Sequence, residues 1–349
     1  MSISSVALDG HSAITPQMIH SLVSEAAKRE ENRSCSTGEE ELQIILDRTV
    51  VHFKDGVDPR KVLHHLITDI SELKKTLSLT AWQALSVKGR EHPVMEYLLE
   101  DMFTRWSIEK PRGYSGDAGL IDFIYYHPSV AAHVAAGTDF GRTLYEYTTA
   151  TAPGVACRER KEFLAKIIDK SAKDHERPID VMTVACGNLR EAAVSDAFHN
   201  DGIGRWLALD QDPICVEGIA ENYEDTVIEP REGSVRTVLQ KGHTFGTFDL
   251  VYATGLYDYL IDKVAIKLTK KCLSMLNPGG KFVFAQYATG LVEGAYMDMF
   301  MNWALILREM GDVERILEKS VEGEDGTYSW KAYFGVHNTV IYAEITRVS

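Results

Sequence analysis

A short turn and an acidic residue further along the chain have the pattern of a nucleoside site. The turn Ala185-Cys186-Gly187 follows an apolar run, and Asp210 ends the next apolar run. In a parallel sheet the first turn meets the charged part of a cofactor, while an acid ending the second strand accepts both ribose hydroxyls. The spacing of roughly 20 residues is typical of such a pair. A nicotinamide cofactor would require G-x-G-x-x-G, and Gly187 is the only glycine of this turn, which favours a nucleoside without phosphates such as S-adenosylmethionine (SAM).

A second segment, residues 110–117, displays reactive side chains on a constrained backbone. Its two glycines and one proline interrupt the helical pattern on both sides of it. Side chains on this segment are suited to bind a carboxylate, an aromatic ring or an amine; they are Arg112, Tyr114 and Asp117. The alternative is a plain turn between two helices, since glycine and proline mark turns first.

Composition narrows the classes of function. The 349 residues carry 37 Lys+Arg against 51 Asp+Glu, and this net charge of −14 disfavours nucleic acid as a partner. The five cysteines form no C-x-x-C, so neither a metal site nor a disulfide framework is expected, and a cytoplasmic location is favoured. We expect no signal peptide and no membrane span. The pattern contains no Ser-His-Asp or Cys-His set, which disfavours a hydrolase.

The first part of the chain has the periodicity of helices. Apolar stripes predict helices over 18–26, 62–77, 94–106, 120–125 and 140–147. Asp58-Pro59 is a start signal for the second of them. The polar stretch 29–41 is predicted as a loop. We therefore assign residues 1–150 to a helical domain that covers the site as a lid.

The second part alternates strands with helices. Strands are predicted at 178–185, 206–209, 235–239, 248–253 and 281–287, followed by a hairpin of 328–334 and 338–347. Helices are predicted at 189–199, 213–223 and 263–276. This alternation indicates an α/β domain over 151–349, with a parallel sheet covered by helices on both faces and a ligand at the carboxyl ends of its strands.

At this level the chain resembles class I SAM-dependent methyltransferases. The A-C-G turn, the D-Q-D strand end and L-N-P-G-G before the fifth strand occur in the order of that family. The resemblance implies a Rossmann-like fold with a seven-stranded, mostly parallel sheet and a C-terminal antiparallel hairpin, preceded by an all-α N-terminal domain. SAM is the implied cofactor.

A narrower set of motifs resembles one bacterial subfamily with a helical N-terminal domain and the motif K-P-R-G-Y-x-G-D. The motifs are KPRGYSGD (110–117), the pair Arg158/Arg160, ACGNLRE (185–191), LDQDP (209–213), GLYDYL (255–260) and NWALILRE (302–309). The subfamily includes 3-hydroxypalmitate methyl ester synthases and azetidine-2-carboxylate synthases. This resemblance implies an enzyme of small-molecule or secondary metabolism.

The resemblance also assigns site residues. It implies that SAM is bound by Arg112, Tyr114, Ala185, Cys186, Gly187, Asp210, Gln211, Leu256 and Tyr257, and that Tyr114, Asp117 and Tyr257 are catalytic. Asp210 would hold the ribose and Gln211 would lie beside the adenine. Ala185 and Leu189 stand where methyltransferases usually have glycine. Cys186 is interpreted as a packed residue rather than a nucleophile, and Asp258 as a cap of the next helix rather than a base.

Three functions remain open. The first is methyl transfer from SAM to a small carboxylate, amine or hydroxyl, since a sulfonium is an activated electrophile that needs alignment and exclusion of water. The second is cyclisation of SAM itself to azetidine-2-carboxylate with release of 5′-methylthioadenosine. The third is a SAM-binding regulator without catalysis. The sequence leaves the acceptor and the oligomeric state undetermined.

Overall fold

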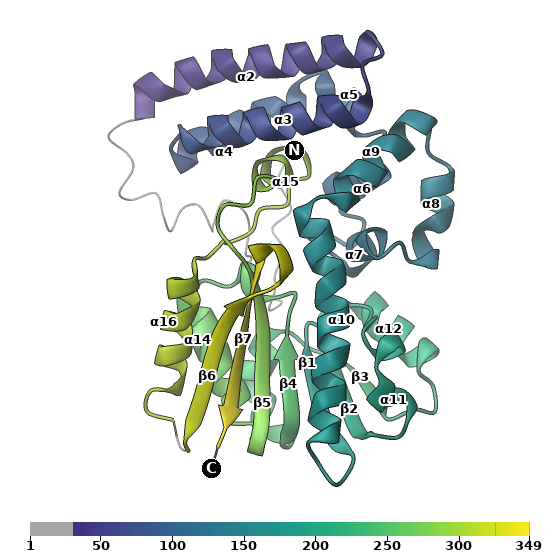
Figure 1. Ribbon diagram of the computed structural model, residues 1–349, viewed down its shortest axis with the longest axis vertical. Coiled ribbons are helices and arrows are strands. Elements are labelled where there is room, and N and C mark those ends of the chain that lie inside the picture. Colours follow the sequence, from purple (N-terminus) through teal and green to yellow (C-terminus); the bar gives the residue numbers. More distant parts are fainter. Residues whose placement is uncertain (1–30, 325, 349) are drawn as a thin grey trace. The chain divides into compact units, whose positions relative to one another are not determined.

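The chain folds into two compact units in the computed structural model, which describes residues 31–324 and 326–348. The helical unit comprises residues 31–155 and Gly290–Leu305. The sheet unit comprises Ala156–Thr289 and 306–348. Figure 1 labels their helices and strands. Among the described residues, no helix combines the length and the apolar character needed to cross a membrane.

The helical unit is built from short and medium helices. They are α2 (Glu31–Lys54), α3 (Pro59–Lys75), α4 (Leu79–Glu91), α5 (Val94–Leu98), α6 (Met102–Glu109), α7 (Ala118–Ile124), η2 (Pro128–Val130), α8 (Ala131–Ala135) and α9 (Asp139–Ala150). Helix α10 (Ala152–Lys173) begins in this unit and continues into the sheet unit. The helix predicted at 18–26 lies outside the described residues.

Local signals explain several of these boundaries. Asp58 caps α3 as predicted, because its side chain accepts a hydrogen bond from the Arg60 N–H at 3.0 Å. The single helix predicted over 94–106 is wrong, because α5 ends at Leu98 and a new helix, α6, starts after the buried Asp101, which caps it. The loop predicted at 29–41 is also wrong from residue 31 onward. There the chain is already helical in α2, which packs on α3 and buries Leu42 and Leu46.

The sheet unit has seven strands, and its architecture confirms the predicted fold class. The strands are β1 (Ile179–Val184), β2 (Ile203–Asp210), β3 (Ile228–Glu232), β4 (Phe248–Ala253), β5 (Leu276–Tyr287), β6 (Tyr328–Phe334) and β7 (Val340–Arg347). Their order is β3-β2-β1-β4-β5-β7-β6. The first five pair in parallel, whereas β7 is antiparallel to β5 and to β6.

Helices cover both faces of this sheet (Figure 1). On one face α10 packs with α11 (Asp196–His199) and α12 (Pro213–Asn222) around a core that includes Ile168, Trp206 and Tyr252. On the other face α14 (Asp262–Leu273) contacts α13 (Val235–Lys241) and α16 (Met310–Val321). All six residues of β4 are buried, as expected of a central strand covered on both sides.

In the sheet unit, two predicted elements are wrong. The strand predicted at 235–239 is helix α13, which starts with a capping box between Ser234 and Thr237. The third strand is Ile228–Glu232, which pairs in parallel with β2. The helix predicted at 189–199 is replaced by a 3-10 turn, η3 (Ala192–Val194), and the short α11.

The chain between β5 and α16 leaves the sheet unit and returns to it. At the base of this excursion the Thr289 N–H donates to the Arg308 carbonyl at 3.0 Å, and the Arg308 N–H donates to the Tyr287 carbonyl at 3.1 Å. The excursion contains α15 (Gly294–Phe300), which packs on α3 and α4 in the helical unit. There Asp298 forms an ion pair with Lys74.

Candidate functional site

The carboxyl edge of the sheet gathers the predicted nucleoside-binding residues of the sheet unit. Strand β1 lies between β2 and β4, so the order of the strands reverses beside it. In open α/β sheets the ligand crevice lies outside the carboxyl ends of the strands at such a reversal. The segments to consider are therefore those that follow β1, β2 and β4.

The turn after β1 follows a left-handed path at alternate residues. Ala185, Gly187 and Leu189 have φ values of 56°, 55° and 50°. These three positions are the ones where methyltransferases usually have glycine. The backbone therefore keeps a path suited to glycine although two side chains are present, which costs about 1–2 kcal/mol for each residue with a Cβ. The fully buried Leu189 side chain packs in the core beneath the turn.

Asp210 joins the end of β2 to this turn. Its Oδ2 accepts a hydrogen bond from the Gly187 N–H at 2.7 Å, and its Oδ1 accepts one from the Asp212 N–H at 2.8 Å. The side chain is 5% exposed, and this burial raises the pKa of the carboxyl, while the two N–H groups act in the opposite direction. Because a carboxylate has about four acceptor positions, each oxygen of Asp210 can accept one further hydrogen bond.

The other predicted residues of the sheet unit are distributed over the turns after β1, β2 and β4. Cys186 is buried, and burial raises the pKa of its thiol well above the usual range, which supports the packing interpretation. Gln211 follows Asp210 directly. Leu256 is buried before the 3-10 turn η5 (Tyr257–Tyr259).

The side chain of Tyr257 lies in the core. Its ring stacks on Phe284 with centroids 3.9 Å apart, and its hydroxyl is 2.7 Å from the Thr269 hydroxyl on α14. The geometry favours a packing role for this side chain, and its catalytic role stays a prediction.

The three predicted residues of segment 110–117 belong to the helical unit. The segment is irregular as expected, with Gly113 and Gly116 at φ 83° and 70°. Asp117 caps α7, where it accepts from the Leu120 N–H at 2.8 Å and from the Trp106 indole at 3.0 Å. These contacts fix the carboxylate within the unit. The roles of Arg112, Tyr114 and Asp117 stay predictions.

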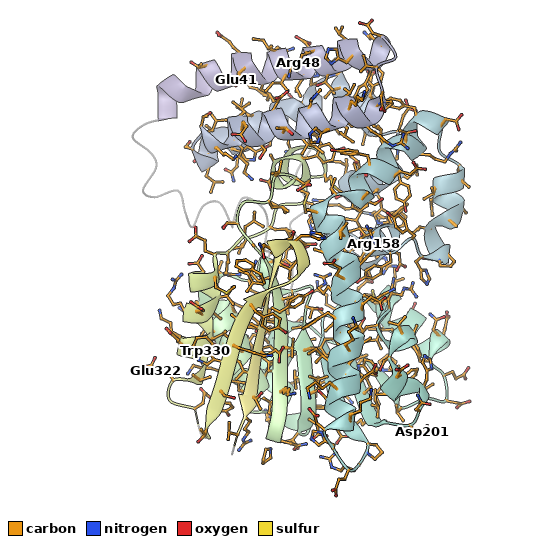
Figure 2. All side chains as sticks on the ribbon, viewed as in Figure 1. Glu41, Arg48, Arg158, Asp201, Glu322 and Trp330 are labelled. Carbon is orange, nitrogen blue, oxygen red and sulfur yellow. The ribbon has the colours of Figure 1, made fainter. Side chains whose placement is uncertain are left out.

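Sequence reasoning assigned no role to a buried polar cluster at the carboxyl edge between β1 and β4. Glu191 follows the β1 turn and accepts a hydrogen bond from the Tyr252 hydroxyl at 2.7 Å. Arg160 on α10 donates to the Thr254 carbonyl at 2.8 Å, directly after β4. Burial raises the pKa of Glu191, and the Arg160 guanidinium partly offsets this effect. Both residues lie in motifs of the resemblance, Arg160 in a pair with Arg158, which is labelled on α10 in Figure 2.

The expected cap at Asp258 is wrong. Ile261 occupies the N-cap position of α14, and no side chain caps that helix. Instead, Oδ1 of Asp258 accepts from the Tyr287 N–H and from Gln286 Nε2, both at 2.7 Å. Arg308 donates to the Tyr257 carbonyl at 3.0 Å and to Gln286 Oε1. The cue available in the sequence was that Asp258 and Arg308 both lie in motifs of the resemblance. Over the described ranges, no group of three or more His, Cys, Asp or Glu is placed to hold a metal ion.

Comparisons with known proteins support the fold. No protein-family model matches the chain, and no curated protein matches it. A possible exported protein from Bordetella parapertussis is similar in structure, with a TM-score of 0.55 and 15% identity over 79% of this chain and 99% of that chain.

Two methyltransferases are more distant structural neighbours. An N-methyltransferase from Bradyrhizobium japonicum in complex with S-adenosyl-L-homocysteine has a TM-score of 0.39 and 14% identity over 55% of this chain and 88% of that chain. Magnesium protoporphyrin IX methyltransferase from Synechocystis with bound SAM has a TM-score of 0.39 and 9% identity over 55% and 81%. At these identities the likeness concerns the fold alone, and the site rests on its own geometry.

Proposed function

We propose that the protein is a SAM-dependent methyltransferase acting on a small molecule. The observation that carries this proposal is the hydrogen bond of 2.7 Å between the Gly187 N–H and Asp210. It joins the turn after β1 to the acid that ends β2, at the edge where the strand order reverses. Such a pair can bind the ribose of a nucleoside together with the substituent that the ribose carries.

The topology favours SAM over a dinucleotide. Dinucleotide-binding sheets have the strand order 3-2-1-4-5-6 and a glycine-rich turn that admits a pyrophosphate. Here the sheet ends in β5-β7-β6 with an antiparallel β7, and the turn has one glycine, Gly187. A sulfonium nucleoside brings no phosphate to this turn.

The residues present fit SAM at this edge. The backbone of 185–187 would line the methionine part, Asp210 would accept from the ribose hydroxyls, and Gln211 would lie beside the adenine. SAM supplies an electrophilic methyl group on a sulfonium. The protein's contribution is to bind it, align a nucleophile with the C–S bond and exclude water.

Binding and turnover of SAM test the proposal directly. Calorimetry with SAM and with S-adenosylhomocysteine measures binding. Mass spectrometry then follows SAM incubated with the protein alone and with panels of small carboxylic acids, amines and hydroxyl compounds. We expect SAM to bind and S-adenosylhomocysteine to form only when an acceptor is present.

Three other outcomes would refute methyl transfer. Stoichiometric 5′-methylthioadenosine and azetidine-2-carboxylate from SAM alone would identify a cyclase. Binding of SAM without any product, over every panel, would identify a regulator. Failure of SAM to bind would remove the proposal altogether.

A further inference from the structure

Asp258 is a buried carboxylate in which one oxygen accepts hydrogen bonds from the protein and the other accepts none from the described residues. It is 3% exposed, and Oδ1 accepts both of its hydrogen bonds, from the Tyr287 N–H and Gln286 Nε2. Within the described part of the chain, Asp258 forms no ion pair and Oδ2 has no hydrogen-bond partner. The side-chain atoms there that lack both a partner and solvent contact are Gln83 Nε2 and Ser171 Oγ. Oδ2 of Asp258 is not among them and therefore keeps contact with solvent.

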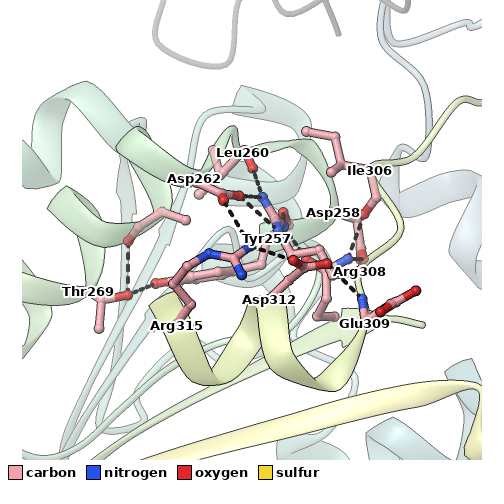
Figure 3. Close-up of polar contacts among 12 residues, drawn as sticks. Tyr257, Asp258, Leu260, Asp262, Thr269, Ile306, Arg308, Glu309, Asp312 and Arg315 are labelled. Atoms are coloured by element: carbon pink, nitrogen blue, oxygen red, sulfur yellow. Dashed lines mark hydrogen bonds and ion pairs between the residues drawn. The ribbon is translucent and has the colours of Figure 1, made fainter. Parts of the chain in front are cut away.

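Arg308 determines how this carboxylate is held (Figure 3). The guanidinium is 2% exposed and donates to the carbonyls of Tyr257 and Leu260, which lie on either side of Asp258 in the chain. It also donates to Gln286 Oε1, so the Nε2 of the same amide points at Asp258 and at the Ile306 carbonyl, 2.6 Å away. One cation thereby fixes both the turn that carries Asp258 and the amide that orients its carboxylate.

The carboxylate lies beyond the carboxyl end of β4, next to the strand-order reversal at β1. The charged and titratable groups around it come from three elements. They are Arg160 on α10, Arg308 before α16, and Tyr287 at the end of β5. Burying a carboxylate without an ion pair costs stability, and titratable groups in such environments gather at functional sites.

We propose that Asp258 is the catalytic base of the methyl transfer and that Arg308 and Gln286 are positioning residues for it. This inference rests on the proposed function and names the acceptor as a neutral amine or hydroxyl. The nucleophile's lone pair forms the bond to the methyl carbon, and the electron pair of the breaking C–S bond remains on sulfur. The proton of the N–H or O–H passes to Oδ2 of Asp258. A carboxylate acceptor has no proton to give and would be repelled by Asp258.

The proton affinity of the group agrees with this geometry. Burial raises the pKa of Asp258 from the usual 3.8 to about 6, while Arg160 and Arg308 lower it in part. The carboxyl is therefore ionised near neutral pH and becomes protonated near pH 6. A base works best when its pKa lies close to the operating pH.

The test compares Asp258→Asn with a matched control, Asp249→Asn. Asp249 is also buried, but it lies at the amino end of β4, where Arg177 and Asn277 donate hydrogen bonds to its carboxylate. We expect Asp258→Asn to lower kcat by roughly 100- to 10,000-fold while the SAM Kd stays within about threefold. Asp249→Asn should lower Tm and leave kcat and the SAM Kd unchanged.

The pH profile of kcat/KM separates positioning from simple structural support. The wild type should lose activity as the pH falls through about 6, the pKa of Asp258. Arg308→Met removes a positive charge that lowers this pKa, so the acidic limb should move to higher pH. Arg308→Lys keeps the charge and should restore the position of the limb.

Several results would overturn the assignment of Asp258 as the base while leaving the proposed binding of SAM intact. They are a kcat of Asp258→Asn within threefold of the wild type, turnover of carboxylic acids only, or no turnover of any amine, alcohol or phenol in the panel. An acidic limb that stays in place in Arg308→Met would remove the positioning role. If wild-type protein fails to bind SAM in calorimetry, the proposed function itself fails.

Discussion

Replacement of Asp210 by alanine isolates the contact on which the proposed function depends. Asp210 lies at the end of β2 and accepts from the Gly187 and Asp212 N–H groups at 2.7 and 2.8 Å. Each oxygen has one acceptor position left for a ribose hydroxyl. A hydrogen bond to a charged group contributes about 1.5–3 kcal/mol, so loss of one such contact should raise the SAM Kd roughly 10- to 150-fold. Loss of both would put binding beyond measurement.

The same substitution leaves two backbone donors without their acceptor. Each unsatisfied buried donor costs about 1–3 kcal/mol, against a typical total stability of about 5–15 kcal/mol. We therefore expect Asp210→Ala to remain folded with a lower Tm. The Tm of Asp210→Asn should lie between those of the wild type and Asp210→Ala, because the amide keeps one acceptor oxygen and places an NH₂ group against a backbone donor.

Isothermal titration calorimetry of SAM measures the effect, and Glu232→Gln is the matched control. Glu232 is the exposed residue that pairs with Asp210 on the neighbouring strand, so its substitution removes an acid from the same edge without altering the proposed contact. We expect Glu232→Gln to bind SAM with the wild-type Kd. Asp210→Ala protein with a native circular dichroism spectrum and an unchanged SAM Kd would refute the assignment of Asp210 to the ribose.

Three further predictions address stability and the helical unit. Because Ala185 has a φ of 56°, Ala185→Gly should raise the free energy of unfolding by up to about 1 kcal/mol. The control Ala208→Gly, in β2, should lower it. Urea denaturation measures both, and an equal loss of stability in the two variants would contradict the backbone strain at Ala185. Burial raises the pKa of Asp101 to about 6, so its proton stabilises the folded state at low pH and this contribution is lost as the pH rises towards 6. The wild-type stability relative to Asp101→Asn should therefore fall by up to about 3 kcal/mol between pH 4 and 7, and a constant difference would refute the shift. Arg112→Ala and Tyr114→Phe should each reduce turnover at least about tenfold, as expected for groups that orient a substrate, and full activity would exclude them from the site.

Local rules were sufficient where one segment of chain carries the whole signal. The cap at Asp58, the turn after β1 and the hairpin of β6 and β7 follow from nearest neighbours, and the structure contains all three. They failed at the edge of the sheet. Strand β3 has mostly exposed or half-buried residues and is a strand because it pairs with β2, whereas 235–239 is apolar and forms a helix.

The candidate site divides in the same way. The sequence by itself determined Gly187 and Asp210 as a pair, because consecutive strands of a parallel sheet bring their ends to one edge. Only the tertiary structure joined Asp258, Gln286 and Arg308, which are separated by 28 and 22 residues along the chain. It also assigned Gly290–Leu305 to the helical unit. The physical reason is that periodicity and capping are set by residues a few positions apart, whereas a buried charge selects its partners from whichever elements pack around it.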